Sequence, residues 1–202
     1  MYCAALLILT AFFSPDGGNG AGDHLLQGAR AFRESRFQEA LVEFQVARKL
    51  GAPDAAGYSG ATLVNLGRPE EALEAFAAAP KGGDALLDYY RAVACYDAKL
   101  YHCADRLLAE VGGRTGPQIA GQAARLREAI RVVLAAEPPR TAIDWYLVRG
   151  TELQRAGRSA LAVAHCQEAA DLADRRQDRY RKTEAEALRD RVAKVAPEGA
   201  LR

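Results

Sequence analysis

The chain has no excess of either charge. Its 27 Lys and Arg side chains nearly balance its 26 Asp and Glu side chains, which leaves a formal net charge of +1 at pH 7. A strongly basic protein attracts nucleic acid or an anionic membrane through its overall field, and this chain has no such field. We therefore expect any partner to be recognised by a local surface.

The sequence also lacks the short motifs of common catalytic and nucleotide-binding sites. No GxxxxGK[ST], GxSxG or GxGxxG segment occurs, and the glycine clusters do not follow predicted strands. The 3 histidines, His24, His102 and His165, are far apart and have no CxxC or HxxxH spacing around them. We predict a protein that is not an enzyme, with no catalytic residues, no metal site and no cofactor.

Cysteine is scarce, with 4 residues in the chain. Cys95, Cys103 and Cys166 would remain if the first segment were removed, and an odd number is no disulfide framework. Cys95 and Cys103 fall on two helices of one predicted hairpin and would meet in an oxidising compartment. Free cysteines are also common as small buried hydrophobic residues, and we favour that second interpretation.

Residues 1–22 differ from the rest of the chain. The apolar run from Ala4 to Phe13 is too short to span a bilayer, no Lys or Arg precedes it, and Gly20 to Gly22 offers small residues for cleavage. One interpretation is a signal peptide, which would place the protein in the periplasm or cell envelope. The other is a disordered start or an extra helix on the first repeat of a cytoplasmic protein. We favour export.

The composition is typical of a soluble helical protein, with 50% hydrophobic residues and abundant Ala and Leu. The stretch from Gly60 to Pro80 has the features of a helical hairpin. Gly67 suits the left-handed end of a first helix, Pro69 suits the first turn of a second, and Glu70 and Glu71 follow at the positive end of its dipole.

The small and large residues of this stretch recur on both sides of it. The recurring sets lie at steps of 32 residues: Gly28, Gly60 and Ala92; Ala40, Ala72 and Ala104; Phe44, Phe76 and Leu108. A weaker copy out of step has small residues at Gly150, Ala162 and Ala169, with Cys166 at the position of the large aromatic. The recurrence predicts several hairpins whose helices approach closely at the small residues.

This pattern resembles the tetratricopeptide repeat family, whose usual period is about 34 residues. The resemblance implies an all-α, right-handed α-solenoid of helical hairpins. It predicts residues 23–136 as three hairpins and a long joining helix, and residues 137–202 as a degenerate fourth hairpin with a charged C-terminal capping helix. Pro138 and Pro139 mark the expected joint between the two.

Periodicity and capping residues predict the helix bounds. The clearest predicted helices are 23–35, 37–50, 85–98, 101–111, 118–136, 142–156, 159–175 and 178–195. Ala124 follows Ala92 by a further step of 32, which suggests that 118–136 is another first helix without a partner. Thr183 and Glu186 have capping-box spacing, so a separate helix is also possible there.

In the family, the first helices of successive hairpins line a concave groove. The resemblance implies that the groove here includes Leu25, Phe32, Arg33, Val64, Asn65, Tyr89, Tyr96 and Asp97. Such a surface suits a peptide or an amphipathic helix of another protein. Several of these residues, above all Phe32 and Tyr96, have the alternative role of packing between neighbouring hairpins.

We therefore expect a non-catalytic adaptor or assembly scaffold that binds a segment of another protein, with no nucleic acid and with membrane contact only through the first segment. Members of the family that clamp a C-terminal carboxylate use Lys, Asn and Arg where this chain mostly has Leu, Ala, Gly or Tyr, which argues against that role. The alternative function is a regulatory or sensor domain that binds a small molecule or signal peptide and bends at Pro138 and Pro139.

Overall fold

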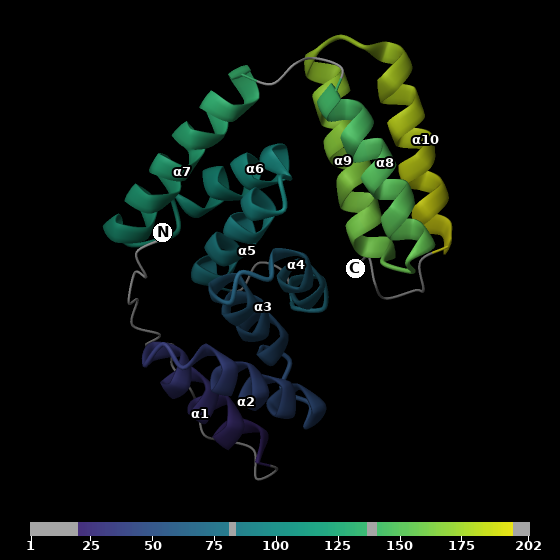
Figure 1. The fold of residues 1–202 in the computed structure, drawn as a ribbon. Helices are drawn as coiled ribbons and strands as arrows, with labels where there is room; N and C mark the ends of the chain where they lie inside the picture. Colours follow the sequence, from purple (N-terminus) through teal and green to yellow (C-terminus); the bar gives the residue numbers. More distant parts are fainter. Residues whose placement is uncertain (1–19, 81–83, 137–140, 196–202) are drawn as a thin grey trace. The chain divides into compact units, whose positions relative to one another are not determined.

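The structure is a computed structural model that describes residues 20–80, 84–136 and 141–195. Within these ranges the chain is all-helical and has no strand, as predicted. The helices are α1 (Ala21–Arg33), α2 (Phe37–Lys49), α3 (Ala55–Asn65), α4 (Pro69–Ala77), α5 (Ala85–Asp97), α6 (Tyr101–Val111), α7 (Pro117–Ala136), α8 (Thr141–Arg155), α9 (Ser159–Arg175) and α10 (Arg179–Val195) (Figure 1). Among the described residues, no helix combines the length and apolar character needed to cross a membrane.

The helices belong to two compact units, Met1–Lys81 and Gly82–Arg202. The first contains α1 to α4 and the second contains α5 to α10. The joint predicted at Pro138 and Pro139 and the apolar run predicted as a signal peptide both lie outside the described residues. Within the second unit α6 packs against both α7 and α9, so helices on either side of the predicted joint are in contact.

One turn geometry recurs in the hairpins of both units. Gly67 has a φ of 70°, as predicted for the end of α3, and the residues one step of 32 before and after it, Ser35 and Lys99, have φ values of 60° and 63°. The N–H of Arg68 then donates to the carbonyl of Leu63 at 2.9 Å, which satisfies a carbonyl at the helix end. Two side-chain-bearing residues thus adopt the conformation that glycine adopts most easily.

The predicted close approach of helices at small residues is confirmed in the first unit. A Cβ built on Gly28 of α1 would lie 2.6 Å from the ring of Phe44 on α2, and one built on Gly60 of α3 would lie 2.9 Å from the ring of Phe76 on α4. Both rings are buried, and Phe44 also stacks on Tyr58 at 5.4 Å between ring centroids. Each glycine therefore leaves the space that a buried aromatic ring fills.

In the second unit, small residues again lie where two helices approach closely, but the large side chain opposite them is a leucine or a cysteine in place of phenylalanine. Ala92 of α5 and Leu108 of α6, one step of 32 further on, are both fully buried. On the weaker copy, a Cβ built on Gly150 of α8 would lie 2.7 Å from the Cys166 sulfur on α9. The sulfur thus occupies the place that an aromatic ring takes in the first unit.

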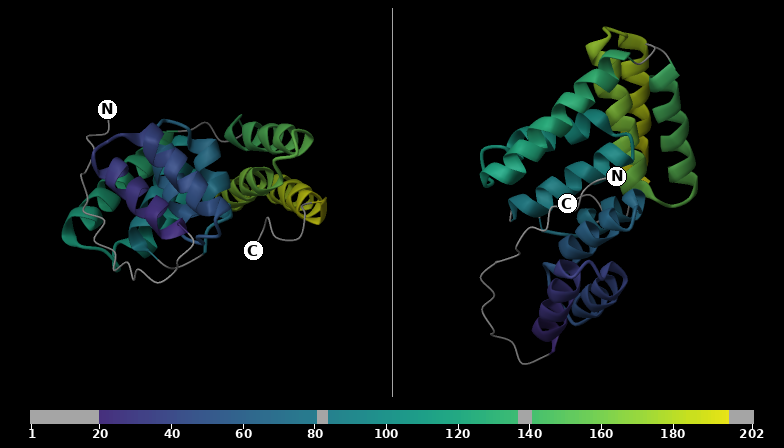
Figure 2. Two further views of the ribbon diagram at one scale, coloured as in Figure 1. Left: turned by 90° about the horizontal axis from the view of Figure 1, so that it is seen from below. Right: turned by 60° about the vertical axis from the view of Figure 1, so that its left-hand side comes forward.

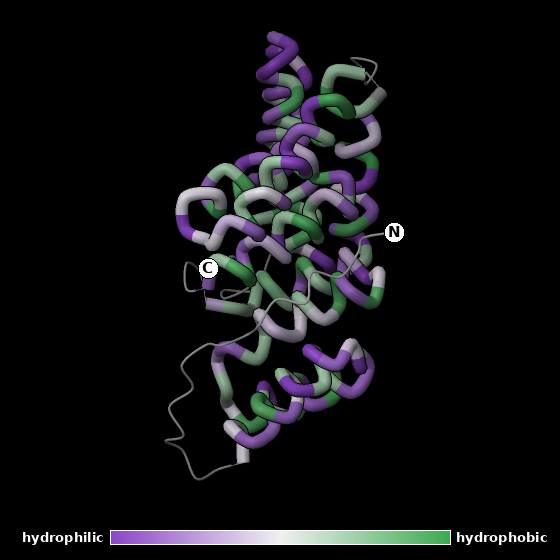
Figure 3. The backbone as a smooth tube through the Cα atoms, turned by 90° about the vertical axis from the view of Figure 1, so that its left-hand side faces the viewer, coloured by the Kyte–Doolittle hydropathy of each residue, from purple (hydrophilic) through white to green (hydrophobic). Residues whose placement is uncertain are grey.

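Helices α8, α9 and α10 lie side by side, and α9 packs on both of the others (Figures 1 and 2). Asp178 accepts the Arg181 N–H at 3.1 Å and caps the start of α10, as the predicted bounds require. The separate helix start at Thr183 is wrong, because α10 continues through that residue. Hydrophilic residues dominate α10 (Figure 3). Its buried face is narrow, with Ala185 and Val192 as its fully buried residues.

The long helix α7 matches its predicted bounds to within one residue. Its buried face consists of Ile119, Ala123, Leu126 and Ile130, whereas Ala124 is exposed. The pattern of buried small residues at steps of 32 therefore does not continue to Ala124, because α7 buries the face that contains Ala123 instead.

Candidate functional site

The predicted groove residues of the first unit differ in accessibility. Leu25 on α1 is 8% exposed and belongs to the hydrophobic core, so it does not offer an open surface. Phe32 is half-buried against Phe37 of α2, at 5.5 Å between ring centroids, which matches its alternative packing role. Arg33 at the end of the same helix is exposed.

Val64 and Asn65 lie at the C-terminal end of α3. Both are half-buried, and the Asn65 side-chain amide donates to the carbonyl of Ala61 at 2.9 Å. This hydrogen bond uses one N–H of the amide and leaves its carbonyl oxygen for another contact. In this unit Arg33, Val64 and Asn65 therefore retain accessible surface.

The predicted groove residues of the second unit lie on α5. Tyr89 meets Tyr90 edge-on at 5.8 Å between ring centroids, and burial raises the pKa of the Tyr89 hydroxyl. Tyr96 meets Tyr101 of α6 in the same way at 5.7 Å, and Asp97 is exposed at the helix end. Each tyrosine is half-buried, with one part of its ring in packing and the rest accessible.

A second group of residues, which the sequence reasoning missed, joins α6 to α9. Glu168 of α9 is only 2% exposed, and its carboxyl group accepts the backbone N–H of His102 at 2.6 Å and that of Cys103 at 3.1 Å. These N–H groups belong to the first turn of α6, where a helix has no partners of its own. No side chain next to α6 in sequence caps it, so Glu168 supplies the cap from 66 residues away.

Burial dominates the electrostatics of this cap. Desolvation raises the pKa of Glu168 to about 8, although the two backbone N–H groups act in the opposite direction. Burial likewise lowers the pKa of His102 to about 4, so its imidazole is neutral near pH 7. Both His102 ring nitrogens lack a hydrogen-bond partner among the described residues. Glu168 and His102 therefore provide a carboxyl group and an imidazole that both favour their neutral forms.

Two thiols lie beside the cap. The sulfur atoms of Cys95 on α5 and Cys103 on α6 are 3.0 Å apart, and both residues are free cysteines. Cys95 is buried and Cys103 is partly accessible. The hydrogen bond from Cys95 lowers the pKa of Cys103, with help from Arg106 and Arg91, while the same bond and burial raise the pKa of Cys95.

Lys99, in the turn between α5 and α6, makes two contacts with α8. The Tyr146 hydroxyl donates to the Lys99 carbonyl oxygen, and the Lys99 ammonium lies 5.6 Å from the centroid of the Trp145 ring. Trp145 is 42% exposed, whereas Tyr146 is buried. We call the residues that join these hairpins the junction: Cys95, Lys99, His102, Cys103, Trp145, Tyr146 and Glu168.

One signal in the sequence points to the junction. Glu168 lies on the same face of α9 as Leu161, His165 and Leu172, and all four residues are buried. A carboxyl group therefore interrupts a largely apolar stripe of this helix. Within the described part of the chain, no group of His, Cys, Asp and Glu residues is arranged to hold a metal ion.

Comparison with models of known protein families, with curated proteins and with solved structures finds no match to this chain. The resemblance to tetratricopeptide repeats therefore rests on the residues themselves and stays a prediction.

Proposed function

We propose that the protein is a non-catalytic binding module, built of tetratricopeptide-type hairpins in a right-handed solenoid, that holds a peptide or helix of another protein. The observation that carries this proposal is the reuse of one hairpin design. Gly28 with Phe44, and Gly60 with Phe76, pack in the same way, and the left-handed turn occurs at Ser35, Gly67 and Lys99, which are 32 residues apart. Stacked repeats of one unit generate extended concave surfaces that suit elongated ligands.

The accessible groove residues supply suitable chemistry for such a ligand. Tyr89 and Tyr96 are half-buried, so their rings are already held by packing and lose little freedom on binding. Asp97, next to Tyr96 on α5, is exposed and provides a negative charge. An apolar or amphipathic segment with a few polar groups is the ligand class that this set favours.

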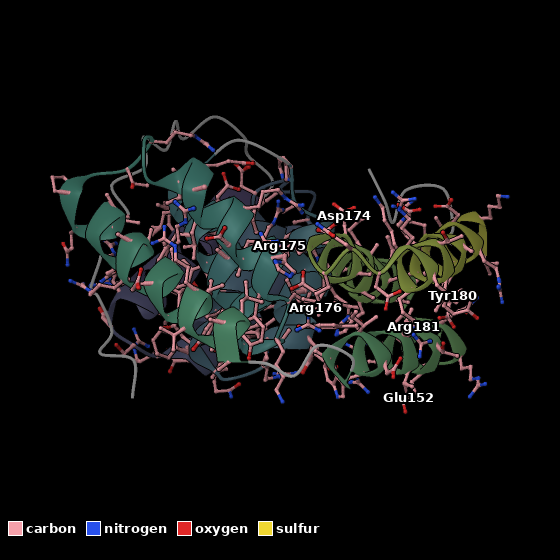
Figure 4. The ribbon with its side chains drawn as sticks, turned by 90° about the horizontal axis from the view of Figure 1, so that it is seen from above. Glu152, Asp174, Arg175, Arg176, Tyr180 and Arg181 are labelled. Atoms are coloured by element: carbon pink, nitrogen blue, oxygen red, sulfur yellow. The ribbon has the colours of Figure 1, made fainter. Side chains whose placement is uncertain are left out.

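The test uses the tagged full chain, expressed in its source cells, as wild type, as a Tyr89→Ala/Tyr96→Ala variant and as a Tyr180→Ala control. Tyr180 is in the first turn of α10 and is 77% exposed (Figure 4), and among the described residues α10 makes no contact with α5. A segment of a captured protein is then titrated against each purified variant. Loss of two aromatic anchors is expected to weaken binding at least tenfold.

The control is expected to bind like the wild type. Equal affinity of all three proteins, with circular dichroism showing an intact fold, would refute the groove assignment.

The alternative regulatory role bends the chain at Pro138 and Pro139, outside the described residues, and no observation favours it over binding. Export to the cell envelope also stays a prediction, which the mass of the mature N-terminus would test.

A further inference from the structure

The two sulfurs of the junction are close enough to react with each other. A disulfide bond is about 2.05 Å long, so the Cys95 and Cys103 sulfurs, at 3.0 Å, need to approach by only about 1 Å more. They lie on the adjacent helices α5 and α6, and the hairpin turn at Lys99 already holds these helices together. Covalent closure therefore requires small side-chain movements and leaves the helix pairing intact.

We propose that Cys95 and Cys103 form a reversible dithiol–disulfide pair, which a low-molecular-weight disulfide such as glutathione disulfide oxidises. This proposal goes beyond the binding function and does not depend on it. The two thiols differ in a way that sets the order of reaction. Cys103 is partly accessible and lies in the first turn of α6, where the helix dipole favours a thiolate, whereas Cys95 is buried.

The reaction consists of two thiol–disulfide exchanges. The Cys103 thiolate attacks one sulfur of glutathione disulfide, the sulfur–sulfur bond of that molecule breaks, and one glutathione leaves as a thiolate that takes up a proton. Cys95 then loses its proton to solvent and attacks the Cys103 sulfur, which expels the second glutathione. Two protein thiols are oxidised to one disulfide, and one glutathione disulfide is reduced to two glutathione thiols.

A disulfide bond between Cys95 and Cys103 would close a loop of the chain, and residues of this loop make the contacts with α8 and α9. Between the two cysteines, the Lys99 carbonyl accepts the Tyr146 hydroxyl and the His102 N–H donates to Glu168. The Cys103 N–H, at the end of this segment, also donates to Glu168. Oxidation would therefore restrain the part of the α5–α6 hairpin on which α8 and α9 pack.

The alternative is that both cysteines are buried hydrophobic side chains that never react. The full-length reduced protein is incubated with mixtures of glutathione and glutathione disulfide, quenched with N-ethylmaleimide under denaturing conditions and digested with trypsin. Cleavage after Arg91, Lys99 and Arg106 separates the cysteines into peptides 92–99 and 100–106. Only a disulfide then holds the two peptides together.

We expect the linked pair to become the main form as glutathione disulfide increases, and to separate into two free peptides after reduction. Peptide 159–175, which contains the buried Cys166, is expected to carry N-ethylmaleimide at every ratio. The proposal is overturned if Cys95 and Cys103 are alkylated at every ratio, or if either is linked mainly to Cys3 or Cys166.

Single variants test the order of attack. In Cys95→Ser the reaction should stop at a mixed disulfide between Cys103 and glutathione, whereas in Cys103→Ser the buried Cys95 should remain unmodified. Cys166→Ser is the matched control and should form the linked pair to the same extent as the wild type. Glutathione on Cys95 in the Cys103→Ser protein, with none on Cys103 in the Cys95→Ser protein, would contradict the assignment of Cys103 as the attacking thiol.

Discussion

Single glycines set how closely the paired helices approach. At Gly60 an added methyl group would meet three carbon atoms of the Phe76 ring at 2.9 Å, and that ring is buried. At Gly121 on α7 an added methyl group would meet nothing within 4 Å. The same substitution is therefore expected to have opposite effects at these two helix positions.

We predict that Gly60→Ala destabilises the fold by about 1–2 kcal/mol, because overpacking outweighs the better helix propensity of alanine. Gly121→Ala should instead stabilise it by about 0.5 kcal/mol, since only the propensity and the entropy of the unfolded chain change. Urea denaturation of both variants measures the difference. Equal stability of the two proteins would show that Gly60 is not needed for the approach of α3 and α4.

The buried Glu168 makes stability depend on pH. Its pKa is raised from 4.5 to about 8 in the folded state, so the stability it contributes is fully present below pH 4.5 and is lost as the pH rises toward 8. His102 acts in the opposite sense, because its pKa is lowered from 6.5 to about 4. Its contribution is present above pH 6.5 and is lost as the pH falls toward 4.

The two contributions oppose each other between pH 4.5 and 6.5, and only that of Glu168 changes between pH 6.5 and 8. We predict that the free energy of unfolding falls by about 1.4 kcal/mol per pH unit in this upper range. In Glu168→Gln that decline should disappear, while the rise due to His102 from pH 4 to 6.5 remains. Chemical denaturation across pH 4–9 measures both curves, and parallel curves would contradict the buried, neutral Glu168.

At the scale of the helical elements, the turns carry backbone strain that the glycines relieve. Gly67 and Gln177 both have left-handed φ values, of 70° and 56°. No atom lies within 4 Å of a Cβ added at Gly67, so conformation alone decides the effect of a substitution there. The turn between α9 and α10 adopts this conformation with a side chain present.

We predict that Gly67→Ala costs about 1 kcal/mol of stability, because alanine is strained in the left-handed region. Gln177→Gly should stabilise the protein by about 0.5 kcal/mol, since the relief of strain exceeds the entropy that glycine adds to the unfolded chain. Thermal denaturation measures both. A loss of stability in Gln177→Gly would show that the Gln177 side chain makes a compensating contact.

One of the contacts between α8 and the α5–α6 hairpin is a hydrogen bond from a tyrosine hydroxyl group. The Tyr146 hydroxyl donates to the Lys99 carbonyl oxygen, while Tyr180 has a largely exposed ring. Tyr146→Phe leaves the carbonyl without this donor and should reduce the free energy of unfolding by about 1 kcal/mol. Tyr180→Phe, the matched control, should leave it unchanged. Fluorescence of Trp145, the only tryptophan, follows both transitions.

At the scale of the whole chain, local signals predicted the helices well. Gly67 and Pro69 mark helix ends by their own conformational preferences, and each marks one in the structure. Such preferences act within a few residues, so a single sequence is enough to reveal them. The small residues at steps of 32 also identified which helices pair.

The same reasoning could not predict the contacts that form the junction, although Glu168 interrupts an otherwise largely apolar face of α9. Glu168 reaches the first turn of α6 across 66 residues, and no local pattern links a carboxylate to backbone groups so distant in sequence. The close approach of Cys95 and Cys103 followed from their shared hairpin, but their access to solvent depends on packing. Leu25 was assigned to the groove by its position in the repeat, whereas its actual burial depends on the neighbouring helix.

The proposed binding function is tested most directly by a photo-crosslinking amino acid placed at Tyr96 and, separately, at Tyr180 of the full-length protein in its source cells. Tyr96 is half-buried on the proposed groove of α5, and Tyr180 is exposed on α10. We predict that light produces a covalent adduct with one segment of another protein from position 96 and none from position 180. Adducts from both positions alike, or from neither, would contradict the account.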